Sequence, residues 1–163
     1  MKILICPGSA ENQKFKRWST ENFILLATQL SNKSNEVIIL LGPEEIYLNK
    51  SFSSFKIMHS LSFSELSKLS NDVDLVICND SFLMHYFSFL NNNVLAIYGP
   101  TNPNRTLPPN CNKICSNNPS IYMPCWGSQQ YGRCDKGKCS CFKNLEVDNV
   151  LDKTYDLLNI IEK

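Results

Sequence analysis

Short apolar runs rich in β-branched residues alternate with helical patterns along the first two-thirds of the chain. The runs cover residues 2–6, 37–41, 74–78 and 94–98, with a weaker one at 56–59. Such alternation is typical of parallel βαβ units. The run at 74–78 is too apolar for a sheet with one wet face, so we expect helices on both faces. The sequence therefore predicts an α/β fold with a doubly wound parallel sheet, in a single domain spanning residues 1–163.

The segments between these runs carry helix signals. Four apolar residues at helical spacing share one face of a helix predicted over 19–30: Phe23, Leu26, Ala27 and Leu30. Ser62 with Glu65 three residues later is a capping box, which predicts a helix to about residue 69. A third helix is predicted over 81–90, and an amphipathic helix from Val147 to Ile161 closes the chain. A candidate edge strand lies near 113–115.

Composition and charge limit the classes of partner. Hydrophobic residues make up 43% of the chain and charged residues 19%, which is a globular composition, and the net charge is +1. No broad basic surface indicates nucleic acid, so an anion site must be local. No run approaches the roughly 18 apolar residues of a membrane span, and the apolar start of the chain is too short for a signal peptide. We therefore expect a soluble, cytoplasmic protein without a transmembrane segment.

The loop after the first strand is the first candidate site. In the strand order 3-2-1-4-5 the chain reverses direction between the first and fourth strands, and ligands bind outside the carboxyl ends of the strands at that switch point. The loop after Cys6 contains Gly8 and Ser9, followed by Lys16 and Arg17. A small-residue turn brings backbone N–H groups close to an oxygen, and the cations neutralise a diphosphate. The alternative is a solvated basic loop.

The loop after the fourth strand faces the same crevice. Asp80 or Ser81 is expected to be the N-cap of the next helix, which points N–H groups and the positive end of its dipole at the crevice. His85, one turn later, could donate to a phosphate or ribose oxygen. The alternative is that Asp80 only caps and His85 is structural.

A third segment follows the strand at 94–98. Its Thr101 and Arg105 could reach the same crevice, although this segment is equally compatible with a structural loop. The chain contains neither a G-x-G-x-x-G fingerprint nor a Walker lysine motif, which argues against a dinucleotide dehydrogenase or an NTPase.

Five segments together resemble the carboxyl-terminal half of glycosyltransferase family 9, the bacterial lipopolysaccharide heptosyltransferases. They follow one another in the family's order and spacing over nearly the whole chain. The matching pieces are Pro7-Gly8-Ser9, Lys16-Arg17-Trp18, Leu41-Gly42-Pro43-Glu44-Glu45, Asn79-Asp80-Ser81 with Leu83-Met84-His85, and Gly99-Pro100-Thr101-Asn102-Pro103 with Arg105-Thr106.

The resemblance implies one half of a GT-B-type, Rossmann-like architecture that binds a nucleotide-diphospho-sugar, typically ADP-heptose, for lipopolysaccharide or surface glycan synthesis. It also implies roles for particular residues. Ser9 and Lys16 would contact phosphates, Glu44 or Glu45 would lie near the nucleoside, and Asp80, Ser81 and His85 would line the diphosphate and sugar. Transfer would need no metal or other cofactor, because the positive loop and the helix end stabilise the leaving diphosphate.

The chain departs from the family pattern at three points. The family's glycine after the Asp-Ser pair is Phe82, which we expect to narrow the site, and its proline after the tryptophan is Ser19. The acceptor domain, which carries the catalytic base in the family, is absent from these 163 residues. We therefore expect transfer only with an acceptor half: either that half is a separate chain, or these residues are a fragment, or catalysis has been lost. An acceptor-domain chain or a homo-oligomer is the possible protein partner. The alternatives are a non-catalytic nucleotide-sugar-binding remnant and an assembly module.

Six of the eight cysteines crowd into an irregular loop at about 108–143, before the last helix. In a reducing cytosol such crowding favours a metal finger over disulfides. The segment from Cys125 resembles a cysteine-bearing loop of the family, which forms a metal finger in a branch that glycosylates autotransporters. Four thiolates would suit structural Zn or Fe. The predicted ligands are Cys125, Cys134, Cys139 and Cys141, with Cys111 and Cys115 as alternates; free or oxidised thiols are the other reading.

Overall fold

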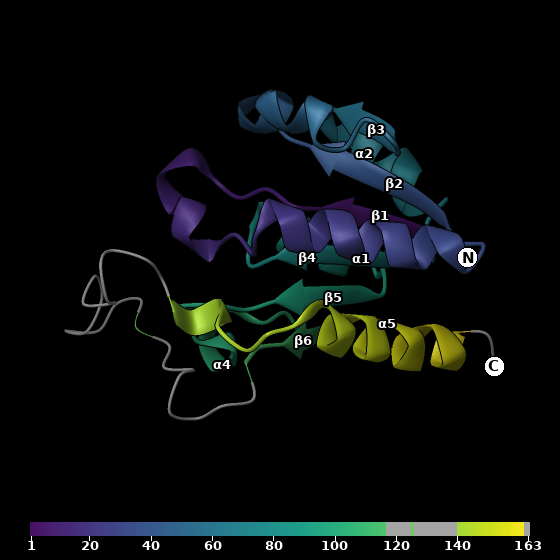
Figure 1. Ribbon diagram of the computed structural model, residues 1–163. Helices are drawn as coiled ribbons and strands as arrows, with labels where there is room; N and C mark the ends of the chain where they lie inside the picture. The colour runs from purple at the N-terminus through teal and green to yellow at the C-terminus, as the bar shows by residue number, and fades with distance from the viewer. Residues whose placement is uncertain (117–124, 126–139, 162–163) are drawn as a thin grey trace.

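Six parallel strands form one sheet in the computed structural model, which describes residues 1–116, 125 and 140–161. The strand order is β3-β2-β1-β4-β5-β6, and every neighbouring pair is parallel (Figure 1). This confirms the predicted doubly wound sheet and its 3-2-1-4-5 order. The strands are β1 (Lys2–Cys6), β2 (Glu36–Leu41), β3 (Lys56–His59), β4 (Leu75–Asn79), β5 (Val94–Ile97) and β6 (Cys111–Ile114).

The edge strand β6 begins at Cys111 rather than near Lys113, because its pairing with β5 starts opposite Val94. The helices follow the predicted segments closely. They are α1 (Thr20–Asn32), α2 (Phe63–Ser70), α3 (Phe82–Phe89), α4 (Pro103–Thr106) and α5 (Val147–Ile161), with short 3₁₀ turns η1 (Glu11–Lys16), η2 (Pro43–Lys50) and η4 (Ser140–Phe142). The turns η1, η2 and η4 and the short helix α4 were not predicted.

Two helices begin where their capping residues predict. The Ser62 hydroxyl accepts from the Glu65 N–H at 3.4 Å, and the Glu65 carboxylate accepts from the Ser62 N–H at 2.8 Å, which completes the capping box of α2. The Ser62 hydroxyl also donates to Glu65 Oε2 at 2.6 Å, and this bond, followed by the one from the Ser62 N–H, lowers the pKa of the Glu65 carboxyl group. The Ser19 hydroxyl accepts from the Asn22 N–H at 3.1 Å and starts α1.

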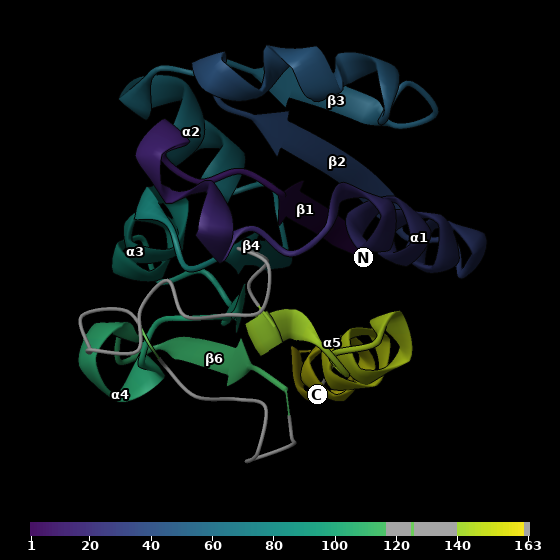
Figure 2. The ribbon, with the colours of Figure 1, turned by 60° about the vertical axis from the view of Figure 1, so that its left-hand side comes forward.

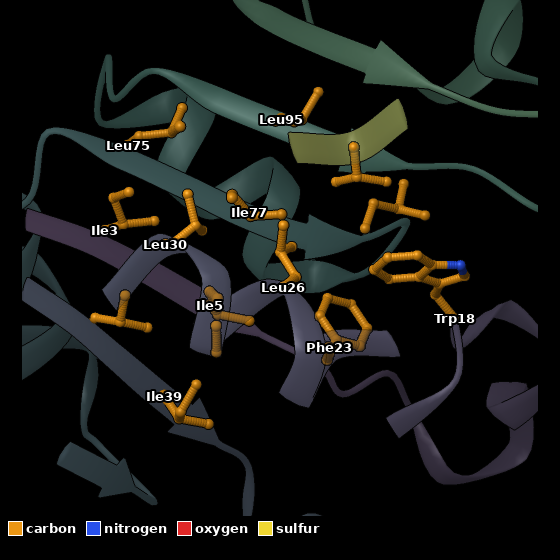
Figure 3. Close-up of a cluster of buried hydrophobic side chains, with 14 of the residues drawn as sticks. Ile3, Ile5, Trp18, Phe23, Leu26, Leu30, Ile39, Leu75, Ile77 and Leu95 are labelled. Atoms are coloured by element: carbon orange, nitrogen blue, oxygen red, sulfur yellow. The ribbon is translucent and has the colours of Figure 1, made fainter. Parts of the chain in front are cut away.

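Helices cover both faces of the sheet. Helices α1 and α5 lie on one face and α2 and α3 on the other (Figures 1 and 2). On the α1 side, Phe23 and Leu26 pack against Ile5 and Ile77 (Figure 3). All five residues of β4 are buried, as a strand covered on both faces requires.

Cys6 and Cys78 belong to the core on the α2 and α3 side, and both are almost wholly inaccessible to solvent. Burial raises the pKa of each of these thiols, and it raises the pKa of Cys111 to about 12. The thiols therefore stay protonated at neutral pH and act as small core residues, as the sequence predicted for Cys6 and Cys78.

Within the part of the chain that the structure describes, no helix combines the length and apolar character that a membrane crossing demands.

Ile77, at the centre of β4, tests the two-sided core. Its side chain is fully buried, so Ile77→Ala should lower the free energy of unfolding by about 2–5 kcal/mol, measured by urea denaturation. Leu25 on α1 is 47% exposed, and Leu25→Ala should change this free energy by only about 0.5 kcal/mol. Equal losses for the two variants would contradict the packing described above.

Candidate functional site

A cavity of about 470 Å³ opens at the carboxyl ends of the strands. The loops after β1, β2 and β3 line it, together with the first turns of α2 and α3. Its lining residues include Ser9, Glu44, Glu45 and Ser81 from the predicted site, and a largely apolar set beside them: Ala10, Leu40, Leu41, Pro43, Leu61, Phe63, Leu66, Phe82 and Leu83. The cavity thus involves both loops at the switch point, as predicted, and extends from there towards β2 and β3.

Asn79, the last residue of β4, joins the two loops at the switch point. Its fully buried carboxamide accepts from the Trp18 N–H at 2.9 Å and donates to the carbonyl oxygens of Pro7 at 2.8 Å and Gly8 at 3.2 Å. One side chain therefore fixes both ends of the segment that follows β1. Asn79 was not among the predicted site residues, although a carboxamide at the end of a wholly apolar strand was a signal, because buried amides need partners.

Lys16 and Asp80 form a second link between the loops. The Lys16 Nζ lies 3.0 Å from Asp80 Oδ2, and the two side chains are only 11% and 4% exposed. Of the two N-cap residues that the sequence allowed for α3, the structure has Ser81 at that position, while the Asp80 carboxylate pairs with Lys16. Such a shielded ion pair depends on both partners, since either charge left alone would be poorly solvated.

Arg17 also forms an ion pair with an acidic side chain. Its guanidinium donates to Glu45 Oε1 at 3.1 Å, to the Ser9 carbonyl at 2.5 Å and to the Ser9 hydroxyl at 3.1 Å. The buried Glu45 in turn accepts from the Gly42 N–H at 2.6 Å. A Cβ at Gly8 would lie 2.3 Å from the Glu45 carboxyl carbon. Only a glycine at this position therefore lets the Glu45 carboxylate lie this close to the backbone of the loop. Glu45 therefore lines the cavity with its charge offset by Arg17, which is not itself a lining residue.

The start of α3 offers anion-binding groups. The N-cap residue Ser81 lines the cavity, and its Oγ is buried without a hydrogen-bond partner among the described residues. The first backbone N–H groups of a helix have no intrahelical acceptor and carry the positive end of the helix dipole. Together they provide donors for one anionic group at the cavity.

Six of the predicted donor-binding residues are not among those that line the cavity: Lys16, Arg17, Asp80, His85, Thr101 and Arg105. His85 is exposed on α3, Arg105 is exposed on α4, and Thr101 is buried after β5. Their roles remain predictions. Glu44 does line the cavity, and its carboxylate accepts from the Glu11 N–H at 2.9 Å.

Part of the predicted metal site falls outside the described residues. Cys134 and Cys139 lie there, while Cys125 and Cys141 are described and buried. Among residues 1–116, 125 and 140–161, no group of three or more Cys, His, Asp or Glu side chains is arranged to hold a metal ion. The prediction of structural Zn or Fe therefore stays a prediction.

Removing the Asn79 carboxamide should loosen the loop after β1. Asn79→Ala leaves one buried N–H and two carbonyl oxygens without their partner, so the free energy of unfolding should fall by at least about 2 kcal/mol. Amide hydrogen exchange at Trp18 should become faster. Asn71→Ala, at an exposed amide, serves as the control and should change stability by only about 0.5 kcal/mol. An unchanged exchange rate at Trp18 would contradict this role for Asn79.

A double-mutant cycle tests the Lys16–Asp80 pair. Lys16→Met and Asp80→Asn should each lower the free energy of unfolding by about 3 kcal/mol, and the double variant should lose much less than their sum. The exposed pair Lys56–Glu36, at 3.2 Å, is the control and should couple by less than about 1 kcal/mol. Additive losses at Lys16 and Asp80 would show that the two residues do not depend on each other.

Comparison with known proteins agrees with this geometry. The family model for glycosyltransferase family 9 (heptosyltransferase) matches residues 1–134. The fold is similar to that of E. coli ADP-heptose lipopolysaccharide heptosyltransferase II, with a TM-score of 0.79 and 21% identity over 99% of this chain and 47% of that one. A family 9 glycosyl transferase from Veillonella parvula gives 0.75 and 21%, over 97% and 46% of the two chains.

A third similar structure is the dodecameric, iron-containing heptosyltransferase TibC of E. coli in complex with ADP-D-β-D-heptose, with a TM-score of 0.67 and 15% identity over 96% of this chain and 45% of that one. No curated protein sequence matches the chain. The chain thus spans about half the length of these solved relatives and corresponds to one half of their GT-B-type fold. With the family model matched over most of its length, the chain belongs to glycosyltransferase family 9.

Proposed function

We propose that the chain binds a nucleoside-diphosphate sugar, as the donor half of a heptosyltransferase-like glycosyltransferase. The observation that carries the proposal is the cavity at the switch point, where the loops after β1 and β4 are fastened together by Asn79 and by the Lys16–Asp80 pair. Ligands of open parallel α/β sheets bind at this place. Membership of glycosyltransferase family 9 supports the same reading.

The diphosphate would lie across the start of α3. The Ser81 hydroxyl and the first N–H groups of α3 supply donors that have no acceptor of their own among the described residues. An ammonium group has three N–H donors, so Lys16 can keep one on Asp80 while another reaches a phosphate oxygen. Asp80 would then hold the lysine in position and offset its positive charge. Binding would therefore require a ligand with two or more negative charges.

The same groups would also promote transfer of the sugar. As the bond from the sugar to the diphosphate breaks, negative charge grows on the leaving oxygen, and donors already in place stabilise it at little cost in reorganisation. We expect ADP-heptose as the donor and cytoplasmic synthesis of lipopolysaccharide or another surface glycan as the setting. The ADP-heptose complex of TibC is compatible with this choice of donor.

Binding without transfer is the second candidate function. It is favoured by Phe82, which lines the cavity at the first turn of α3. A nucleotide-sugar-binding module would retain donor affinity and produce no glycoside when an acceptor-binding half is supplied. Appearance of product under those conditions would identify the chain as a working transferase half.

Isothermal titration with ADP, UDP and GDP tests the proposed site. We expect micromolar binding of one nucleotide, weakened at least about tenfold in the double variant Lys16→Met/Asp80→Asn, which removes both charges together. Lys68→Met, an exposed position on α2, is the matched control and should leave the affinity unchanged. Absence of binding at millimolar nucleotide would overturn the proposal.

A further inference from the structure

Helix α3 presents apolar side chains on both of its sides. Met84 and Phe87 pack into the core on the α2 and α3 face of the sheet, and Ser88 is buried as well. Phe82 and Phe89 lie on the outer side, where they are 58% and 81% exposed. A surface helix ordinarily has polar residues on its outer side, and a helix that is apolar all round is ordinarily covered all round. The outer side of α3 therefore has the composition of an interface.

The outer side of α3 and the start of α2 together form an aromatic stripe of four residues. Residues four and seven positions apart share one side of a helix, so Phe82, Tyr86 and Phe89 follow one another along α3. Phe63, the first residue of α2, completes the stripe: its ring centroid lies 5.9 Å from that of Phe82 and 5.5 Å from that of Tyr86. The Tyr86 hydroxyl donates to the Phe63 carbonyl oxygen at 2.9 Å. This end of the stripe is therefore held in shape before a partner arrives, which reduces the entropy lost on binding.

The aromatic stripe carries no charged group. Helix α3 contains no Asp, Glu, Lys or Arg, and the two charged residues of α2, Glu65 and Lys68, are exposed and have opposite signs. The chain as a whole has a net charge of +1, so two copies hardly repel each other. A charged partner, such as a nucleic acid or an acidic protein, would find no counter-charge on the stripe. A second copy of the same uncharged stripe would meet neither repulsion nor an unpaired charge.

The exposed area of the stripe fits a dimer of moderate stability. An aromatic side chain offers about 150–250 Å² to a partner, so Phe63, Phe82 and Phe89, which are 64%, 58% and 81% exposed, present roughly 300–500 Å² on each copy. Stable interfaces bury about 800 Å² on each partner, and weak or transient ones bury less. The three rings thus supply about half of such an interface, and residues around them would supply the rest. We therefore expect a dissociation constant in the micromolar range.

We propose that the aromatic stripe is the interface of a dimer formed by two copies of this chain. A two-fold dimer uses the same surface on both copies, and with the axis perpendicular to α3 the two α3 helices run antiparallel. Phe82 of one copy then meets Phe89 of the second copy, and Tyr86 lies near the axis. The dimer does not depend on the proposed function, although its interface adjoins the cavity, because Phe63 and Phe82 also line the cavity.

Sedimentation equilibrium of the whole chain tests the dimer, in a reducing buffer because the chain has eight cysteines. The average mass should rise from that of one chain towards that of two between about 1 and 300 µM, as a micromolar dissociation constant requires. Phe89→Ser should weaken association at least about tenfold, because it removes an aromatic contact from both halves of the interface. Phe89 does not line the cavity, and its 81% exposure means that the change leaves the core intact. Leu25→Ser on α1, at a residue 47% exposed on the opposite face of the sheet, is the matched control and should associate as the native chain does.

Two charged variants test the antiparallel arrangement. Phe82→Glu and Phe89→Lys should each associate more weakly than the native chain, because each places a charge against an apolar ring. Mixed in equal amounts, they should form a mixed dimer at least about tenfold more tightly than either variant pairs with itself. The introduced carboxylate and ammonium groups then face each other across the interface. A mixture that associates no better than its components would overturn the proposed pairing.

Other results would also count against the dimer. A native chain that stays monomeric up to about 300 µM would overturn it, and a native dimer unaffected by Phe89→Ser would have its interface elsewhere. A monomeric chain that binds phosphatidylcholine vesicles, and loses that binding in Phe89→Ser, would assign the stripe to a lipid surface instead. Circular dichroism and thermal unfolding show whether each variant is folded. Phe63→Ser, on the neighbouring helix, is a second variant that should weaken association in the same way.

Discussion

The carboxamide of Asn79 is the contact on which the geometry of the site depends. It stands where β4 ends, without exposure to solvent, and bonds to both ends of the segment after β1. In a sheet whose order reverses between β1 and β4, the two following loops diverge, and a gap opens between them. The Asn79 amide bridges that gap at the end of β4. Backbone donors and side chains that follow separate strands are therefore held at fixed positions around one cavity.

Charge at the site is present but balanced. Lys16 is paired with Asp80 and Arg17 with Glu45, so both of these cations have an acid against them. This arrangement agrees with a chain of net charge +1, in which no extended field attracts polyanions. If the chain binds a small diphosphate as proposed, its selectivity would depend on donors placed at short range, above all at the start of α3, and on the apolar and aromatic lining beside them.

The sequence predicted the order of the first five strands, the four longer helices and the capping box of Ser62 and Glu65. The helices and the capping box were predictable because local periodicity and capping chemistry act within a few residues. The sequence also predicted a site at the carboxyl ends of the strands, because right-handed crossovers leave little choice, and the structure has a cavity there. It left the N-cap of α3 open between Asp80 and Ser81, and it did not foresee that Asp80 pairs with the distant Lys16 or that the Phe63 and Phe82 rings meet. Pairings between distant segments depend on the finished packing, and no local pattern encodes them.

A crystal structure of the chain with ADP would test the central claim most directly. The account predicts the diphosphate at the start of α3, with phosphate oxygens bonded to the Ser81 hydroxyl and the first free N–H groups of that helix, and with Lys16 reaching from Asp80 to the phosphate. The base would then lie in the cavity bounded by the loops after β1, β2 and β3. ADP bound at another surface, with this cavity holding only water, would contradict the account.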